Sequence, residues 1–185
     1  MSIAEAIDFT KDSVPMASEQ NINKHYIEKI PVLSNDRVVL KEIQLHDVAA
    51  IIEISVYDGV FAKSQTEAIH ILEQINLDVA KGEALHWGIF LKNTSELVGT
   101  CGYYRGYANN SGEIGYILRP SYYGLGIMTE AVNLIVNFGF DILNLHSVIA
   151  YTDPANSASI AVLKRVGFNS VRNEGADLKF EKRHP

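Results

Sequence analysis

The stretch that decides the fold is Arg119-Pro-Ser-Tyr-Tyr-Gly-Leu-Gly-Ile-Met128. The apolar run before it, residues 113–118, indicates a strand, and residues 129–138 after it indicate a helix. The backbone N–H groups in the first turn of a helix have no internal partner, and the helix dipole makes that end positive. Gly124 and Gly126 lack a Cβ, so an anion can come close to the main chain. The stretch therefore predicts a place for the pyrophosphate of a ligand.

Two common nucleotide-binding motifs do not match this turn. A dinucleotide-binding fingerprint has a third glycine where Thr129 stands, and it lies early in a βαβ unit rather than two-thirds along the chain. A Walker A loop needs G-x-x-x-x-G-K-[ST], which the sequence lacks. A lone G-x-G is equally compatible with a purely structural turn, so the surrounding sequence has to decide.

Five short motifs surround the turn: Tyr123 to Ile127, Thr129-Glu130-Ala131, Phe138-Gly139-Phe140, Asn156 to Ser159, and Gly167-Phe168. In this order they resemble acetyl-CoA-dependent acyltransferases of the GNAT superfamily, and within it the ribosomal-protein N-acetyltransferase (Rim-type) branch. The resemblance covers roughly residues 36–168. It departs from the branch at Tyr123, where Trp is usual, but the position stays aromatic.

Hydrophobic periodicity predicts strands over 37–43, 85–91, 97–105, 112–118, 147–152 and 178–182, and helices over 45–54, 64–80, 127–142 and 157–166. Strands 112–118 and 147–152 flank a helix, so they should be parallel neighbours. We expect a single α/β (α+β) domain over 36–185: a mixed sheet with a central antiparallel meander and flanking helices. The resemblance implies that the parallel pair splays and admits the thioester arm, as in the acyl-CoA N-acyltransferase fold. Residues 1–35 form an N-terminal extension in which a short helix over 18–28 is possible.

Composition narrows the function classes. The 185 residues are 47% hydrophobic and 21% charged, which suits one globular domain, and the net charge is −6. A nucleic-acid binder would need a basic face, whereas an acidic protein is compatible with a cationic acceptor. Cys101 is the only cysteine and the six histidines lack metal-ligand spacing, so we expect no metal. No signal peptide or membrane-length apolar run is present, so we expect a cytoplasmic protein without membrane partners.

The reaction that the resemblance implies is attack of a primary amine on the thioester of acetyl-CoA, and the amine must be neutral. An α-amino group with a reference pKa near 8 is roughly one-tenth neutral at pH 7, whereas a lysine-type amine is neutral about four times in ten thousand. Glu113 is the candidate base, acting directly or through water, and otherwise a solvated strand-end carboxylate. Ser159 is the candidate acid near the coenzyme sulfur, and otherwise an ordinary first-turn residue behind the helix cap Asn156.

The resemblance also implies a set of acetyl-CoA contacts: Ile117, Leu118, Tyr123, Gly124, Leu125, Gly126, Ile127, Met128, Asn156 and Ser159. The backbone N–H of Leu118 would be the oxyanion donor, and Asn156 would both cap its helix and bond the pantetheine arm. Arg119 could pair with a phosphate or serve a structural turn next to Pro120.

We therefore expect an N-acetyltransferase that works through a ternary complex, as a monomer or homodimer. Its acceptor would be a peptide N-terminus or a small-molecule amine, selected by loops over 55–65 and 104–112 and by the C-terminal hairpin. Two other classes remain open: a non-catalytic acyl-CoA-binding module, which would need neither Glu113 nor Ser159, and a nucleotide-binding domain that shares only the glycine turn.

Overall fold

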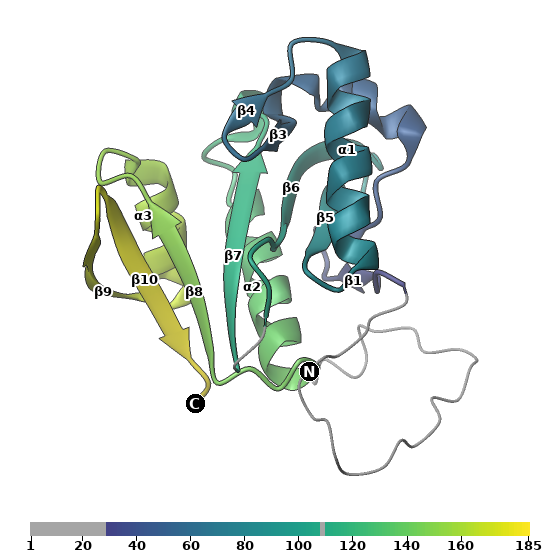
Figure 1. Ribbon diagram of the computed structural model, residues 1–185. Coiled ribbons are helices and arrows are strands. Elements are labelled where there is room, and N and C mark those ends of the chain that lie inside the picture. The colour runs from purple at the N-terminus through teal and green to yellow at the C-terminus, as the bar shows by residue number, and fades with distance from the viewer. Residues whose placement is uncertain (1–28, 108–109) are drawn as a thin grey trace.

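The protein is described by a computed structural model over residues 29–107 and 110–185, so the possible helix over 18–28 lies outside the described residues. Its main feature is an eight-stranded sheet with helices on both faces (Figure 1). In spatial order the strands are β1 (Leu33–Ser34), β2 (Val38–Lys41), β5 (Leu85–Leu91), β6 (Leu97–Tyr103), β7 (Ser111–Leu118), β8 (Ser147–Thr152), β10 (Asp177–Arg183) and β9 (Asn169–Glu174).

One pair of neighbouring strands, β7 and β8, is parallel, and every other pair in the sheet is antiparallel. The parallel pairing joins Ser111–Glu113 to Ser147–Ile149 and stops there. Beyond Glu113 the two strands diverge, and β8 leaves with β10, β9 and a short helix (Figure 1). The mixed sheet with an antiparallel meander and a splayed parallel pair is thus confirmed.

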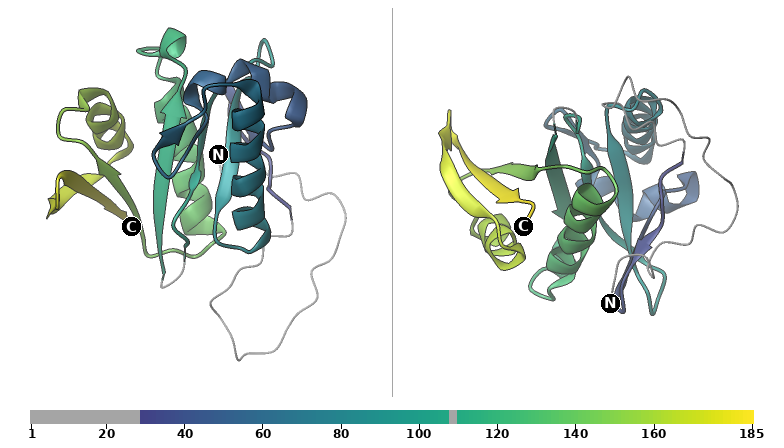
Figure 2. Two further views of the ribbon diagram at one scale, coloured as in Figure 1. Left: turned by 45° about the horizontal axis from the view of Figure 1, so that its top comes forward. Right: turned by 90° about the horizontal axis from the view of Figure 1, so that it is seen from below.

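Helices cover the two faces of the sheet. The helix α1 (Gln65–Ala80) lies on one face with the 3-10 turns η2 (Leu45–Ala50) and η3 (Ile52–Ile54), and α2 (Ile127–Asp141) lies on the other (Figure 2). The helix α3 (Ser157–Val166) lies beside α2 and accompanies β8. The 3-10 turn η4 (Pro120–Tyr122) leads from β7 toward α2.

The start of α1 confirms a capping signal in the sequence. The Ser64 hydroxyl accepts the N–H of Glu67 at 3.2 Å, and the Glu67 carboxylate accepts the N–H of Lys63 at 2.8 Å. These bonds satisfy two amides that the helix cannot pair internally. The helix therefore begins where a serine is followed three residues later by glutamate.

Two apolar clusters hold the layers together. The larger lies between the sheet and α2 and includes Trp87 and Phe138, whose rings meet edge to face at 5.5 Å. The indole N–H of Trp87 donates to the carbonyl of Pro31 at 2.7 Å, so its polar atom is satisfied in the core. The smaller cluster packs α1, η2 and η3 on the opposite face around Phe90 and Leu97.

Three sequence expectations differ from the structure. The helix expected over 45–54 is two 3-10 turns, which Ile51 divides with a φ of −125°. The expected loop over 55–65 contains a hairpin of two short strands, β3 (Val56–Tyr57) and β4 (Val60–Phe61). Part of the expected extension, β1, pairs with β2, so the sheet begins before residue 36. Strands of two residues are too short to produce a readable hydrophobic alternation.

Candidate active site

The glycine turn presents its backbone as the sequence predicts. Gly124 and Gly126 both have φ +77°, a conformation that residues with a Cβ rarely adopt, and Gly126 caps α2 without a side-chain bond. The first hydrogen bond of α2 runs from the N–H of Glu130 to the carbonyl of Gly126 at 3.2 Å, so three helical amides precede it. The Cβ position of Gly124 has nothing within 4 Å. The turn can therefore receive an anion on bare main chain.

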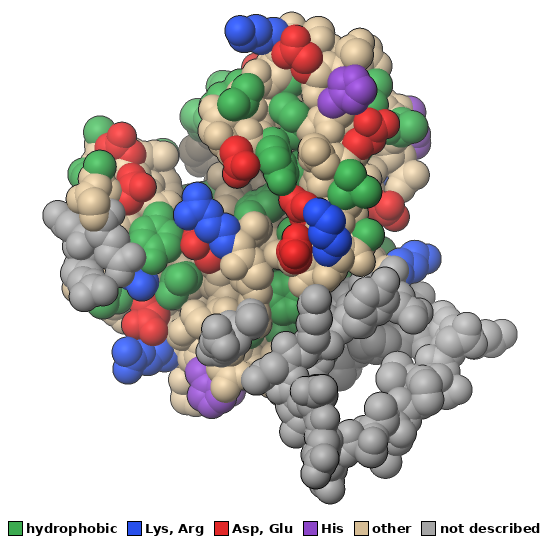
Figure 3. Space-filling view, in the orientation of Figure 1, with side chains coloured by type: hydrophobic (Ala, Val, Ile, Leu, Met, Phe, Trp, Pro, Cys, Tyr) green, Lys and Arg blue, Asp and Glu red, His purple; other side chains and the backbone are tan. Residues whose placement is uncertain are grey.

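A cleft of about 880 Å³ lies between β7 on one side and β8 and α3 on the other. The space-filling view in Figure 3 shows the surface hollowed between the part formed by β8, β10 and α3 and the rest of the molecule. Most of the expected acetyl-CoA contacts line this cleft: Ile117, Leu118, Tyr123, Gly124, Gly126, Ile127, Met128, Asn156 and Ser159. Leu125, which is 55% exposed, is the one expected contact that does not line it.

Two features of the cleft fit a phosphate-bearing coenzyme. The hydroxyl oxygen of Thr129, in the first turn of α2, is buried and has no hydrogen-bond partner among the described residues. Arg37 and Arg165 also line the cleft, so it carries two guanidinium groups. The guanidinium groups, the unpaired hydroxyl and the free helical amides suit the charge and the acceptor oxygens of a pyrophosphate. Three acidic side chains, Glu130, Asp153 and Asp177, line the same cleft.

Arg37 is a site residue that the sequence analysis missed. Its Nη2 donates to the carbonyl of Leu125 at 2.9 Å, and its Nη1 lies 3.6 Å from the carboxylate of Glu130. Asn35 donates to the same carboxylate at 2.8 Å, which holds the start of β2 against the start of α2. Leu125 is 88 residues away in sequence, so no local motif could connect Arg37 to the glycine turn.

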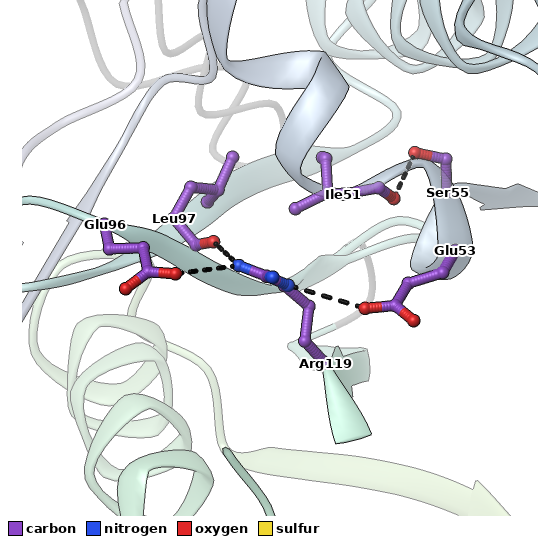
Figure 4. Close-up of polar contacts among 6 residues, drawn as sticks. All are labelled: Ile51, Glu53, Ser55, Glu96, Leu97 and Arg119. Carbon is purple, nitrogen blue, oxygen red and sulfur yellow. Dashed lines mark hydrogen bonds and ion pairs between the residues drawn. The ribbon is translucent and has the colours of Figure 1, made fainter. Parts of the chain in front are cut away.

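Arg119, the alternative phosphate partner, is engaged elsewhere. Its Nη1 donates to Glu96 at 3.0 Å and to the carbonyl of Leu97 at 3.3 Å, and its Nε lies 3.4 Å from Glu53 (Figure 4). The side chain does not line the cleft. Of the two readings of Arg119, the structure supports the structural one: the arginine ties the end of β7 to β6 and to η3.

The start of α3 brings a hydroxyl pair into the cleft. The side-chain oxygen Oδ1 of Asn156 accepts the N–H of Ser159 at 3.0 Å, so Asn156 is the N-cap that the sequence predicted. The Ser159 hydroxyl lies 2.9 Å from the hydroxyl of Tyr116, which reaches it from β7 across the cleft. Burial raises the pKa of Tyr116 to about 12, so this phenol keeps its proton at neutral pH. Tyr116 was not predicted, because its partner comes from an element far along the chain.

Glu113 stands where β7 and β8 part. It is the last residue of the parallel pairing, and its side chain is 22% exposed. Burial raises the pKa of the Glu113 carboxyl, while the charges of Arg105 and Lys179 oppose that shift. The Nε of Arg105 lies 3.6 Å from the carboxylate. A raised pKa strengthens a carboxylate as a base, so the environment suits proton acceptance.

A second hollow lies on the other face of β7. This chamber, of about 370 Å³, is enclosed by β5, β6 and β7, by α1 and by the segment from η2 to the β3–β4 hairpin. Glu113 lines the chamber but not the cleft, and Ser159 lines the cleft but not the chamber. Residues 114–117 of β7 line both, so the two hollows meet along that strand.

Within residues 29–107 and 110–185, no group of three or more histidine, cysteine or acidic side chains is placed to hold a metal ion. None of the helices in the described part of the chain is both long enough and apolar enough to cross a membrane.

The comparison with known families identifies the class. The model of the GNAT acetyltransferase domain matches residues 37–169, and the chain belongs to this family of acetyltransferases. An uncharacterized N-acetyltransferase, p20, from Bacillus licheniformis is 30% identical over 158 residues, which cover 81% of this chain and 87% of that protein. The family assignment favours an enzyme over a non-catalytic acyl-CoA module or a nucleotide-binding domain.

Solved structures agree with the expected branch. A proposed ribosomal-protein-serine acetyltransferase from Vibrio cholerae superposes with a TM-score of 0.74 at 24% identity, over 83% of this chain and 97% of that one. RimJ of Mycobacterium smegmatis, solved in complex with CoA-disulfide, has a TM-score of 0.69 at 25% identity, over 79% of this chain and 81% of its own. The predicted resemblance to the GNAT superfamily, with Rim-type structural neighbours, is therefore confirmed.

Proposed function

We propose that this acetyltransferase moves the acetyl group of acetyl-CoA directly to a primary amine, either a peptide N-terminus or a small molecule, in a ternary complex. The observation that carries the proposal is the meeting of two hollows along residues 114–117 of β7. The cleft beside the glycine turn suits acetyl-CoA, and the chamber beside Glu113 suits the acceptor. The thioester and the amine would meet where the strands part.

In this proposal the cleft binds the pyrophosphate of the coenzyme through main-chain amides and an arginine, and it binds the pantetheine arm between β7 and β8. The pyrophosphate would lie on the amides from Gly124 to Thr129, with Arg37 beside them. The pantetheine arm would enter between β7 and β8, where the strands no longer pair and Asn156 lines the wall. The backbone N–H of Leu118 would stabilise the oxyanion.

Glu113 would prepare the nucleophile. An ammonium ion has no lone pair, so Glu113 accepts one proton from the bound amine, directly or through water. The neutral nitrogen then attacks the thioester carbon, and its second proton passes to solvent water as the amide forms and the thiolate leaves. The charge of Arg105, 3.6 Å away, opposes the rise in the carboxyl pKa that burial causes.

Ser159 would receive the leaving group. When the carbon–sulfur bond breaks, the electron pair stays on sulfur, and the thiolate needs a proton or a hydrogen bond. The Tyr116 phenol can donate to the Ser159 oxygen at 2.9 Å, which leaves the serine proton free for the sulfur. A thiolate is a good leaving group, so a hydrogen bond from a hydroxyl is useful even though its pKa is high.

Direct transfer is favoured over a cysteine acyl-enzyme. Cys101 is the only cysteine in the sequence, and its side chain is fully buried in the core. Burial raises the pKa of its thiol, so hardly any reactive thiolate forms at neutral pH.

The test is a thiol-release assay with acetyl-CoA over a panel of amines and N-terminal peptides. We expect release of CoA to depend on the amine, and mass spectrometry to find one acetyl group on the acceptor. Coenzyme binding by calorimetry without release for any amine would contradict the proposed transfer and point to a coenzyme-binding role.

A further inference from the structure

We infer that the chamber selects a primary amine with a single charge and a largely apolar, uncharged body, rather than a polyamine. The inference rests on the proposed function, because it assigns the acceptor to the chamber, and it narrows that function to one chemical class of acceptor. Three properties of the chamber support it: aliphatic side chains along its walls, a neutral polar pair at its floor, and carboxylates that already have partners or lie at its rim.

The walls of the chamber are aliphatic. The helix α1 contributes Ala68, Ile71, Leu72 and Ile75 to it, and η2 and η3 contribute Val48 and Ile54. A second ammonium group placed among these side chains would lose its hydration without gaining a partner, which is costly. An alkyl or aromatic body would instead gain free energy for each apolar surface that leaves water.

The floor of the chamber is polar but carries no charge. His86 on β5 and Tyr104 at the end of β6 both line it, and the histidine Nδ1 lies 2.7 Å from the phenol oxygen. His86 is 7% exposed, and burial lowers its pKa to about 4, so the ring is neutral at physiological pH. The pair satisfies itself and can still meet one hydroxyl or carbonyl of a ligand.

A glycine on β7 shapes this floor. A Cβ on Gly115 would lie 2.9 Å from Cδ2 and 3.2 Å from Cε2 of Tyr104, so the ring lies close over the bare backbone of β7. The ring can pack this close to β7 only because residue 115 has no side chain. Gly115 and Tyr104 together set the depth of the chamber next to Glu113.

The acidic groups of the chamber are engaged or lie at its rim. Asp78 accepts the phenol hydrogen of Tyr57 at 2.8 Å and lies 3.3 Å from the ammonium group of Lys81. Glu113 faces Arg105 at 3.6 Å and is the proposed base for the reacting nitrogen. Asp58 lies exposed in the turn between β3 and β4. Glu113 is thus assigned to the reacting amine. Of the two other carboxylates that line the chamber, Asp78 is already engaged by Tyr57 and Lys81, and Asp58 lies at the exposed rim.

The experiment compares alkyl monoamines of increasing length with α,ω-diamines of equal length, using thiol release on the full-length protein. Each added methylene should raise kcat/KM of the monoamines about fourfold until the chamber is full. Each diamine should be poorer than its monoamine by tenfold or more. A diamine that is preferred at every length would overturn the inference while leaving acetyl transfer intact.

A pair of variants tests whether the chamber is the selecting site. Ile71→Phe puts a larger side chain at a half-buried position that lines the chamber, whereas Leu77→Phe makes the same kind of change at a position 53% exposed and outside it. Ile71→Phe should reduce kcat/KM for the longest monoamine at least tenfold and leave the shortest nearly unchanged, and Leu77→Phe should change neither. An equal loss at all lengths, or no loss, would contradict the assignment of the acceptor body to the chamber.

Calorimetry distinguishes three cases: a wrong assignment of the acceptor to the chamber, an unfolded variant, and a wrong proposed function. Both phenylalanine variants should bind acetyl-CoA as the wild type does, because the cleft lies on the other side of β7. If the longest monoamine binds to the CoA-loaded wild type but no amine is acetylated, the chamber assignment stands and the proposed transfer fails. If no monoamine binds or reacts while peptides or diamines do, the transfer stands and the inferred class is wrong.

Discussion

At the scale of the residue, two opposing effects act on Glu113. Burial raises the pKa of its carboxyl group, and the charge of Arg105, 3.6 Å away, opposes that shift. This combination suits a base, and a base is more useful to an amine that is mostly protonated at neutral pH.

We predict that Glu113→Gln lowers turnover about a hundredfold at neutral pH and leaves the affinity for acetyl-CoA nearly unchanged. The loss should shrink above pH 8, where an α-amine deprotonates without help. Glu83→Gln, at an exposed position before β5, is the matched control and should be silent. A pH–rate profile of Glu113→Gln that keeps both its height and its acid limb would remove Glu113 from the mechanism.

The same variant should not destabilise the protein. A carboxyl group with a raised pKa binds its proton more tightly in the folded state, so folding stability falls as pH rises toward that pKa. Glutamine carries no charge to desolvate at neutral pH, so the melting temperature of Glu113→Gln should equal or exceed that of the wild type. A clearly lower value would mean that the Arg105 ion pair outweighs burial.

His86 predicts a pH dependence of stability that has the same origin, burial, but the opposite sign. Its pKa falls from 6.5 to about 4 on folding, so the unfolded chain binds more protons between these values. Stability should therefore be full above pH 6.5 and fall as pH drops toward 4, by a maximum on the order of 3 kcal/mol. His86→Gln removes this titration, so denaturant unfolding of the variant should show a shallower loss over the same range. Equal slopes would show that His86 protonates freely in the folded state.

At the scale of the element, the site depends on how one strand and two helix starts are placed. The glycine turn holds the amides of α2 at one end of the cleft, and Asn156 fixes the start of α3 at its wall. The strand β7 separates the cleft from the chamber. Changes at the two helix starts should therefore affect the cleft and spare the chamber.

We predict that Gly126→Asp weakens acetyl-CoA binding tenfold or more, because it adds a like charge to the pyrophosphate site and strains a backbone with φ +77°. Gly175→Asp is the matched control: it has φ +62°, lies in the β9–β10 turn, and has open space around its Cβ position. Calorimetry that finds the two variants equal in affinity would contradict the placement of the pyrophosphate.

The same elements show which parts of the fold could be predicted from the sequence. The bounds of β5, β8 and α3 agree with the expected ranges, because each is a strongly periodic run with clear stops such as Gly82 and Gly167. The β3–β4 hairpin and the 3-10 turns could not be predicted, since their conformation depends on packing against α1 rather than on local pattern.

The residues of the candidate site also fall into two groups, those that the sequence predicted and those that only the structure reveals. Residues of the glycine turn, Asn156 and Ser159 belong to contiguous motifs, and the sequence alone pointed to them. Arg37, Tyr116 and the pair of His86 and Tyr104 gain their meaning from partners on other strands or helices. A single sequence carries no signal for such pairs, because they are defined by tertiary contact.

At the scale of the whole molecule, the cleft and the chamber share residues 114–117 of β7 as a common wall. We predict that a peptide beginning with alanine or serine has a higher kcat/KM than a peptide whose only amine is a lysine side chain. The α-amine is about a tenth neutral at pH 7, and the site offers one base. Competition between the two peptides for limiting acetyl-CoA, read by mass spectrometry, checks this, and a preference for the lysine peptide would be contrary to it.

The central claim is that acetyl-CoA and the amine occupy the cleft and the chamber together and react where β7 and β8 part, without an acyl-enzyme. Initial rates of CoA release, measured with both substrates varied, test it most directly. Simultaneous binding predicts double-reciprocal lines that intersect. Parallel lines, with acetyl-protein accumulating when the amine is withheld, would contradict the account.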